Sequence, residues 1–234
     1  MSSKNENERV QKVVFVRHGI ALHNLPDSNL SDPKLFDPPL IYQGKQQALH
    51  TGHRLQEWWR ASSQKEVELV VTSPLTRCIQ TATLAFLPGD IYTITTTNGS
   101  KKEPSFFCTE LCREAFGMHY PDKRRQRSLL MEYWPMLEFD PGMREMDEAW
   151  KRDARETIRE LHTRISYFFT WLVGRSEKSV VVVTHGVWIE QCVKLYCPKA
   201  LDDGKRRIYN CDMIAMDCIS QNGELCRIEN AHLI

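Results

Sequence analysis

The chain has 234 residues, of which 41 % are apolar and 26 % are charged, and its formal net charge is +1. This is the composition of an ordinary globular protein. A net charge so close to zero argues against a general nucleic-acid or membrane-surface binder, because such proteins usually carry a strong basic excess. The polar first twelve residues lack the apolar core of a signal peptide. We therefore expect a cytoplasmic protein that binds neither nucleic acid nor membrane.

The eight cysteines are expected to be reduced thiols, most of them buried as small apolar side chains. Without a secretory signal, a disulfide framework is a weak interpretation for a chain of this length. No Cys-x-x-Cys pair occurs, although that spacing is typical of structural zinc sites. The sequence therefore predicts no metal and no other cofactor.

The N-terminal half begins with a polar lead and continues into alternating strands and helices. Residues 1–11 are predicted to be disordered, and residues 12–234 to form a single domain. The apolar run 12–17 ends at a glycine, which predicts a buried strand. Apolar residues at helical spacing predict a helix over 42–61, and a second buried strand is predicted over 67–71.

The middle of the chain begins with a helix and then loses its regular pattern. Ser73 is expected to cap this helix, with Pro74 at its first position, where the missing N–H has no cost. Residues 90–97 are a third strand candidate. From about 98 to 145, basic and aromatic residues are interleaved, and we interpret this segment as an insertion that carries short helices.

The last third of the chain alternates between helix and strand again. A long amphipathic helix is predicted over 147–173, and an apolar strand over 179–183 is followed by a helix over 186–197. Residues 211–219 alternate enough to predict a more exposed strand, which 224–230 could pair with. Apolar strands that alternate with helices predict an α/β three-layer sandwich with a mainly parallel central sheet.

Reactive or cationic side chains follow three of the predicted strands. Arg17 and His18 follow the first, Ser73 and Arg77 the second, and His185 the strand over 179–183. Ligands of open parallel sheets bind beyond the carboxyl ends of the strands, so these side chains are expected to meet there. Arginine binds phosphate through two N–H groups and keeps its charge, which predicts an anion site. The start of the helix after Ser73 would add positive dipole and free N–H groups.

The chemistry expected at this anion site is phosphoryl transfer through histidine. The chain has neither a Gly-rich P-loop nor a Cys-x5-Arg motif, and its acidic residues do not cluster at the predicted strand ends. A neutral imidazole can attack phosphorus and hold the phosphoryl group covalently, while arginines stabilise the anionic transition state. A metal site built on His18, His23 and His185 is disfavoured, because Arg17 and Arg77 would repel a cation.

Four stretches of the chain resemble the motifs of the histidine phosphatase superfamily, the phosphoglycerate mutase-like proteins. They are VRHGIALHN (16–24), DPPLIYQGKQQA (37–48), VTSPLTRCIQTA (71–82) and VTHG (183–186), in the order found in that family. The resemblance implies a phosphoglycerate mutase-like fold and makes His18 the phosphorylated nucleophile. It further implies that the phosphoryl group is contacted by Arg17, Arg77, His185 and Asn24. Ser73, at the end of the second strand, is a further candidate substrate-binding residue.

The resemblance also implies a carboxylic acid, because an alkoxide leaves poorly unless it receives a proton. The matching segment is LCREAFG, which makes Glu114 the candidate acid and Glu110 the runner-up. The stretch FGMHYPDKRR (116–125), which begins with the last two residues of that segment, resembles the phosphomutase-like, broad-specificity phosphatase branch of the family. In it, Lys123, Arg124 and Arg125 are candidate contacts for an acidic part of the substrate. The alternative is that they form ion pairs with local carboxylates.

Three functions compete for this site. The first is a metal-independent phosphatase that hydrolyses small phosphomonoesters through a phosphohistidine. The second is a phosphoglycerate or phosphosugar mutase that uses the same residues. The third is a catalytically idle module that binds a phosphorylated ligand or a protein. In the first two the partner is a small phosphorylated substrate, and phosphate release in the presence of a chelator separates the first from the others.

Overall fold

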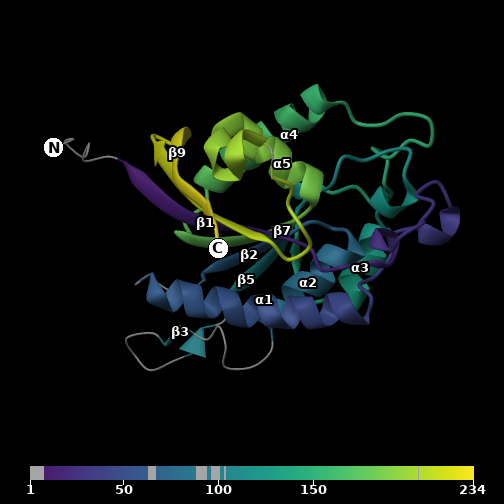
Figure 1. Ribbon diagram of the computed structural model, residues 1–234, viewed down its shortest axis with the longest axis horizontal. Helices are drawn as coiled ribbons and strands as arrows, with labels where there is room; N and C mark the ends of the chain where they lie inside the picture. Colours follow the sequence, from purple (N-terminus) through teal and green to yellow (C-terminus); the bar gives the residue numbers. More distant parts are fainter. Residues whose placement is uncertain (1–7, 63–66, 88–93, 96–100, 103, 205) are drawn as a thin grey trace.

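A seven-stranded sheet between two layers of helices organises the chain (Figure 1). The structure is a computed structural model, and it describes residues 8–62, 67–87, 94–95, 101–102, 104–204 and 206–234. The sheet and its flanking helices confirm the predicted α/β sandwich.

The strands of the large sheet are β1 (Arg9–Arg17), β2 (Leu69–Thr72), β5 (Ser105–Cys108), β6 (Glu138–Phe139), β7 (Ser179–Thr184), β8 (Met213–Gln221) and β9 (Glu224–Leu233). A separate pair consists of β3 (Ile94–Thr95) and β4 (Lys101–Lys102). The helices are α1 (Tyr42–Ala61), α2 (Thr76–Phe86), α3 (Arg127–Tyr133), α4 (Ile158–Val173) and α5 (Gly186–Tyr196).

The order of the strands brings the predicted site to one edge of the sheet. That order is β6-β5-β2-β7-β1-β8-β9. The five strands from β6 to β1 are parallel to one another, and β8 and β9 are antiparallel to their neighbours. The sheet is therefore mainly parallel, as predicted, and the carboxyl ends of β1, β7 and β2 lie next to one another.

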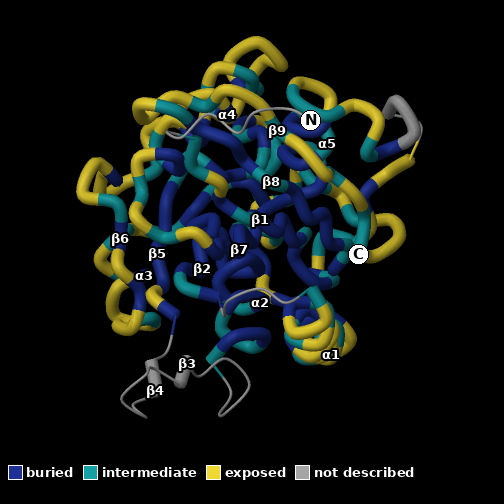
Figure 2. The backbone as a smooth tube through the Cα atoms, turned by 90° about the vertical axis from the view of Figure 1, so that its left-hand side faces the viewer, coloured by how far each residue is buried: buried dark blue, intermediate teal, exposed yellow. Residues whose placement is uncertain are grey.

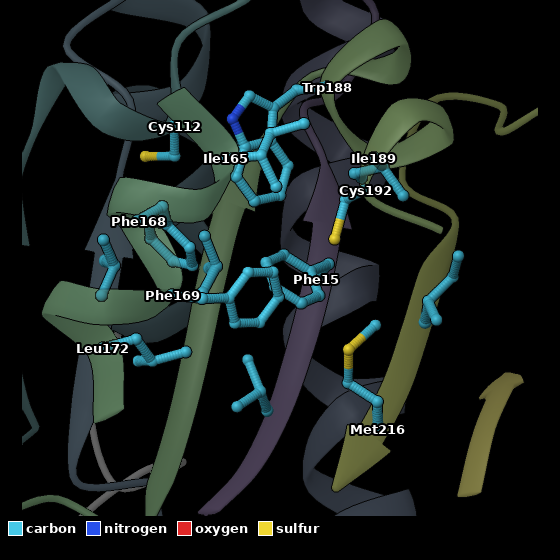
Figure 3. Packing of buried hydrophobic residues seen from close by; sticks show 14 of the residues in the cluster. Phe15, Cys112, Ile165, Phe168, Phe169, Leu172, Trp188, Ile189, Cys192 and Met216 are labelled. Carbon is cyan, nitrogen blue, oxygen red and sulfur yellow. The ribbon is translucent and has the colours of Figure 1, made fainter. Parts of the chain in front are cut away.

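Both faces of the sheet are covered by apolar side chains from the helices. On the face covered by α4 and α5, Phe15 of β1 is fully buried, and its ring centroid lies 5.3 Å from that of Trp188 and 6.1 Å from that of Phe168 (Figure 3). On the other face, Leu55 of α1 and Ile79 of α2 pack against the sheet. Figure 2 shows the buried strands at the centre and the exposed outer side of α1.

Truncation of Phe15 is expected to cost the fold several kcal/mol. Replacing a buried phenylalanine by alanine leaves a cavity, so Phe15→Ala should lower the free energy of unfolding by about 3–5 kcal/mol. Tyr167 in α4 is 62 % exposed, so Tyr167→Ala should change it by about 0.5 kcal/mol at most. Urea unfolding of both variants measures the difference, and equal losses would contradict this account of the core.

The predicted boundary of the disordered lead is wrong for residues 9–11, because β1 begins at Arg9. Arg9 donates to the carbonyl oxygens of Val173 and Glu177, and Gln11 donates to that of Leu172. These side-chain bonds to the end of α4 hold the polar start of the strand in place. The predicted disorder of residues 1–7 lies outside the described residues.

The predicted helix over 147–173 is too long, because α4 begins only at Ile158. Thr157 caps it, and Glu160 bonds back to the backbone N–H of Thr157, which is a complete capping box. The residues before it are held by ion pairs instead, since Asp147 pairs with Arg113, and Glu156 with Arg164. The polar side chains that looked like one face of a helix are thus partners of other segments.

The segment 98–145, interpreted as an insertion with short helices, also supplies two strands of the main sheet. β5 pairs with β2, and β6 pairs with β5. Both strands are short. The prediction of short helices in this segment is confirmed by α3. Of the third strand candidate over 90–97, only 94–95 lies within the described residues, where it forms β3.

The strand predicted over 211–219 is less exposed than expected. β8 is almost entirely buried, since it lies between β1 and β9 in the sheet. The predicted pairing with the following segment is confirmed, because β9 runs antiparallel to β8. The expectation for the cysteines is also confirmed: all eight are free thiols, and six of them are buried.

Candidate active site

The predicted histidines and arginines meet beyond the carboxyl ends of β1, β2 and β7. The parallel register pairs Arg17 with Thr184 and Thr72 with Val183. The backbone continues this pairing past the strands: His18 N–H donates to the Thr184 carbonyl at 3.0 Å, and Ser73 N–H to the Val183 carbonyl at 3.1 Å. Rigid backbone therefore presents the side chains of this edge.

His18 is buried, and its hydrogen bonds define which ring nitrogen carries the proton. Nδ1 lies 2.7 Å from the Gly19 carbonyl oxygen, which can only accept, so Nδ1 is the protonated nitrogen. Nε2 then has a free electron pair, and the Nε–H of Arg77 donates to it at 3.2 Å. Burial and then the charge of Arg77 lower the pKa of His18 well below its usual value. His18 is thus a neutral imidazole with Nε2 unprotonated.

Arg77 lies at the centre of the site and contacts both histidines. Besides His18, its Nη2 donates to Nδ1 of His185 at 3.2 Å and to Oδ1 of Asp122 at 3.1 Å. Its Nη1 donates to the Pro121 carbonyl at 2.6 Å. The guanidinium is only 1 % exposed. A buried positive charge is therefore in contact with both imidazoles, whose ring centroids lie 5.2 Å apart.

His185 is fixed in one tautomer by its two partners. A guanidinium has no acceptor, so Nδ1 of His185 accepts from Arg77, and the proton is on Nε2. Nε2 donates to the hydroxyl of Ser73 at 2.8 Å and also lies 3.3 Å from Sγ of Cys78. Burial, followed by the charge of Arg77, lowers the pKa of His185 well below its usual value. His185 is neutral, and Ser73 orients it.

Arg17 offers an unused donor at the same edge. Its Nη1 donates to the carbonyl of Ile208 at 2.6 Å, whereas its Nε is buried without a hydrogen-bond partner. A methyl group on Gly186 would lie 3.3 Å from the guanidinium carbon, so the glycine allows this close approach. Buried N–H groups are normally paired, and an unpaired one is a candidate contact for an anionic ligand.

Glu114 supplies a carboxyl beside these cationic groups. Its two oxygens accept from the backbone N–H of Ala115 at 3.0 Å and of Val187, in the first turn of α5, at 3.3 Å. Burial and then the negative charge of Asp122 raise the pKa of Glu114 above its usual value. The carboxyl therefore keeps its proton to a higher pH than an ordinary glutamate does. The runner-up, Glu110, instead accepts from both Arg113 and Arg124 and serves as an ion-pair partner.

Asn24 joins a group of polar residues on the other side of His18. Its Oδ1 accepts from Ala21 N–H at 3.0 Å, which leaves its Nδ2 to donate to Nε2 of His23 at 3.1 Å. Asn210 donates to the His18 carbonyl at 2.9 Å. The His23 ring centroid lies 5.8 Å from that of His18, and burial lowers the pKa of His23 to about 2. These neutral groups hold the backbone around His18.

The three basic residues predicted to contact substrate have different surroundings. Arg124 is buried, and all five of its N–H groups are bonded within the chain, to Glu110 and to four carbonyl oxygens. It therefore has no donor left for a substrate, and the ion-pair alternative holds for it. The ion-pair alternative also holds for Arg125, which pairs with Asp37 at 3.2 Å, whereas Lys123 lies over the ring of Trp150. All three line a cavity of about 540 Å³.

The start of α2 differs from the expectation that Ser73 caps it with Pro74 in the first position. The helix begins at Thr76, after Leu75, and the Ser73 hydroxyl is engaged by His185. Asp37, from the loop after β1, takes over the role of the cap: it accepts from the N–H of Thr76 at 2.8 Å and from its hydroxyl at 2.6 Å. One of the N–H groups expected to be free for phosphate is thus occupied.

Sequence reasoning missed two residues of the site, Asp122 and Asn210. Asp122 lies inside the stretch YPDKRR, and a single carboxylate directly before three basic residues was an available signal. Asn210 has no motif around it and reaches His18 only through the fold. Among the described residues, no group of three or more His, Cys, Asp or Glu side chains is arranged to hold a metal ion. In the same part of the chain, no helix combines the length and apolarity needed to cross a membrane.

The chain matches a known protein family over most of its length. Residues 13–97 and 131–231 match the family model of the histidine phosphatase superfamily (branch 1). The chain therefore belongs to the histidine phosphatase superfamily, as its motifs indicated. The matched parts contain His18, Arg77 and His185, whereas Glu114 and Asp122 lie in the segment between them.

Curated relatives carry phosphoglycerate mutase-like names. Over 178 residues the chain is 32 % identical to phosphoglycerate mutase-like protein 1 of Arabidopsis thaliana. This match covers 68 % of this chain and 63 % of the relative. Over 193 residues it is 27 % identical to phosphomutase-like protein 3 of Candida albicans, covering 75 % of this chain and 56 % of that protein. The chain thus spans less than two thirds of the length of these relatives.

Solved structures share the fold at low identity. Phosphoglycerate mutase from Bacillus anthracis superposes with a TM-score of 0.59 at 16 % identity, covering 94 % of this chain and 92 % of that one. A mycobacterial glucosyl-3-phosphoglycerate phosphatase superposes with a TM-score of 0.56 at 16 % identity, covering 96 % of this chain and 99 % of that one. The structural neighbours thus include both mutases and phosphatases, and the fold is phosphoglycerate mutase-like.

Proposed function

We propose that the chain is a metal-independent phosphatase that hydrolyses small phosphomonoesters through a phosphohistidine intermediate on His18. The observation that carries the proposal is the arrangement of His18: it is neutral, its Nε2 is unprotonated, and Arg77 bridges it to His185. A covalent nucleophile needs its attacking atom held in line with the leaving group. The end of a buried parallel strand provides that rigidity.

In the first step, Nε2 of His18 attacks phosphorus as the bond between phosphorus and the ester oxygen breaks. The leaving alkoxide takes the proton of Glu114 and departs as an alcohol, which leaves Glu114 as a carboxylate. Arg17 and Arg77 supply N–H groups and charge to the phosphoryl oxygens in this step, and His185 holds Arg77 by accepting from its Nη2. The phosphoryl group takes the place that the Arg77 Nε–H now occupies at Nε2.

In the second step, water attacks the phosphohistidine and Glu114 takes a proton from it. The bond between phosphorus and Nε2 breaks, so inorganic phosphate forms and His18 returns to its neutral state. Asn24 is the proposed further contact of the phosphoryl group, and Ser73 acts through His185. Lys123 is the proposed contact for an acidic part of the substrate.

Phosphate release from an aryl phosphate in the presence of EDTA tests the proposal. The assay runs from about pH 4 to about pH 8, which brackets the ordinary pKa values of carboxyl and imidazole groups. We expect phosphate release that the chelator does not reduce. Loss of all activity on removal of metal would contradict a metal-independent reaction.

A mutase that uses the same residues is the second candidate, and the names of the relatives favour it. A mutase transfers the phosphoryl group of His18 back to a substrate hydroxyl instead of to water. Incubation with a phosphoglycerate distinguishes the two: isomerisation without net phosphate release indicates a mutase, and net release indicates a phosphatase.

The pH dependence is expected to depend on Glu114. Attack requires neutral His18, whose pKa is lowered, and departure requires protonated Glu114, whose pKa is raised. Activity should therefore fall as pH rises through the elevated pKa of Glu114, at a higher pH than an ordinary carboxyl would give. In Glu114→Gln this basic limb of the kcat/KM profile should disappear.

The same variant also tests the proton transfer itself. Glu114→Gln should lose more activity with an alkyl phosphate than with an aryl phosphate, because a phenolate leaves without a proton more readily than an alkoxide does. Glu110→Gln is the matched control, and we expect its kcat/KM profile to keep the basic limb. Equal losses with the two substrates in Glu114→Gln would assign the acid to another group.

A further inference from the structure

Arg77 is held in place by a carboxylate to which no role was assigned from the sequence and which takes no part in the proposed reaction steps. Asp122 is buried, and its Oδ1 accepts from Nη2 of Arg77 at 3.1 Å, while the adjacent carbonyl of Pro121 accepts from Nη1 at 2.6 Å. The segment 121–122 thus binds the outer side of the guanidinium. The inner side, Nε and Nη2, is left directed at the two histidines.

Asp122 is itself fixed by several contacts. Its Oδ2 accepts from Arg155 at 3.3 Å, and its backbone carbonyl accepts from Arg113 at 2.8 Å. Arg155 also donates to the carbonyl of Gly117, which closes a loop of contacts within this part of the chain. The carboxylate is therefore a rigid anchor, which a flexible surface ion pair would not be.

We propose that Asp122 is a positioning residue of the site, which holds the Arg77 guanidinium where it contacts both His18 and His185. The proposal rests on the proposed function for the reaction that this arrangement serves. A guanidinium anchored by a charge-assisted bond loses less freedom when it binds a phosphoryl group, so binding and transfer both benefit. A lysine or an unanchored arginine would not offer N–H groups in these directions.

The charge of Asp122 has a second consequence at Glu114. The charged groups near Glu114 include Asp122, Arg77, Arg17 and Arg164, which donates to the Glu114 backbone carbonyl at 3.2 Å, and among them Asp122 favours the protonated carboxyl. Removal of this negative charge should therefore lower the pKa of Glu114. The basic limb of the kcat/KM profile should then move to lower pH.

Three variants test the proposal in two measurements. Asp122→Ala removes the bond to Arg77, Asp122→Asn keeps an acceptor but removes the charge, and Asp140→Asn is the control. Asp140 lies in the same segment and accepts from Thr109 at 2.9 Å. Calorimetry with inorganic phosphate measures the anion site without turnover, and the pH profile of kcat/KM with an alkyl phosphate, whose leaving group needs the proton of Glu114, measures the charge effect.

For the affinity, we expect Asp122→Ala to bind phosphate about tenfold more weakly than wild type. Asp122→Asn should recover most of that loss, and Asp140→Asn should bind like wild type. In the pH profile, Asp122→Asn should show the shifted basic limb, whereas a merely structural residue would not move it. The proposal would be overturned if Asp122→Ala bound phosphate as tightly as Asp140→Asn does. It would also be overturned if Asp122→Ala and Asp122→Asn lost phosphate affinity equally and the basic limb of the kcat/KM profile stayed in place in Asp122→Asn.

These outcomes separate this inference from the proposed function. Wild type without turnover, but with the expected pattern of phosphate affinities, would refute the phosphatase and support the role of Asp122. Wild type with chelator-resistant turnover, but with Asp122→Ala unaffected in phosphate affinity, would support the phosphatase and overturn the role of Asp122.

Discussion

His18→Ala is expected to reduce phosphate release by more than about a thousandfold, the loss typical of removing a nucleophile that acts with its partners as a unit. The reason is geometric. Nε2 of His18 is an unprotonated imidazole nitrogen that receives the Arg77 Nε–H, and its position is set by the bond from Nδ1 to Gly19. The ring of His185 is held at both nitrogens instead, since its Nδ1 accepts from Nη2 of Arg77 and its Nε2 donates to Ser73. Initial rates of phosphate release measure the loss.

The matched control is His53→Ala, since His53 is an exposed residue of α1. This variant should release phosphate like wild type, which shows that loss of an imidazole as such has no effect. A His18→Ala variant that is folded and retains more than about a tenth of the wild-type rate would rule out His18 as the nucleophile.

Arg77→Ala is expected to lower kcat/KM by about a hundredfold or more, because a buried charge that meets the developing negative charge is removed. Arg77→Lys should recover little of this loss. A single ammonium group cannot contact His18, His185 and Asp122 in the directions that the guanidinium uses. Steady-state kinetics with an aryl phosphate measures both variants.

Arg77→Ala should also lower the stability of the fold, because Asp122 loses one of its cationic partners while it stays buried. Breaking a buried ion pair by removing one partner costs about 3–5 kcal/mol, and here the remaining contact with Arg155 should reduce that cost. Arg60→Ala, at an exposed position of α1, is the control and should leave rate and stability unchanged. A fall in stability without a fall in kcat/KM would make Arg77 a purely structural residue.

The fold and the centre of the site could be predicted because their signals are local. The apolar run before His18 and the valines before His185 mark buried strands, and parallel strands place their carboxyl ends at one edge. The sheet register then brings Arg17 opposite Thr184. Nothing beyond periodicity and strand direction was needed for this part.

The remaining contacts depend on residues that are distant in the sequence. Asp37 caps α2 from a loop, and this displaced Ser73 from the cap and left its hydroxyl to His185. Arg124 looked like a substrate contact because it lies in a basic stretch, yet the fold surrounds it with carbonyl oxygens. Asp122 is the opposite case, because no role was predicted for it and the fold places it against Arg77. Short sequence patterns give residue types, whereas partners across the fold decide what each charge does.

The central claim is that the phosphoryl group passes through His18, and the stereochemical course at phosphorus tests it most directly. The substrate is a phosphorothioate monoester made chiral with oxygen isotopes and hydrolysed in isotopically labelled water. Each in-line displacement inverts phosphorus, so transfer to His18 and then to water predicts net retention of configuration. Net inversion would show that water attacks the ester directly, and it would contradict the phosphohistidine mechanism.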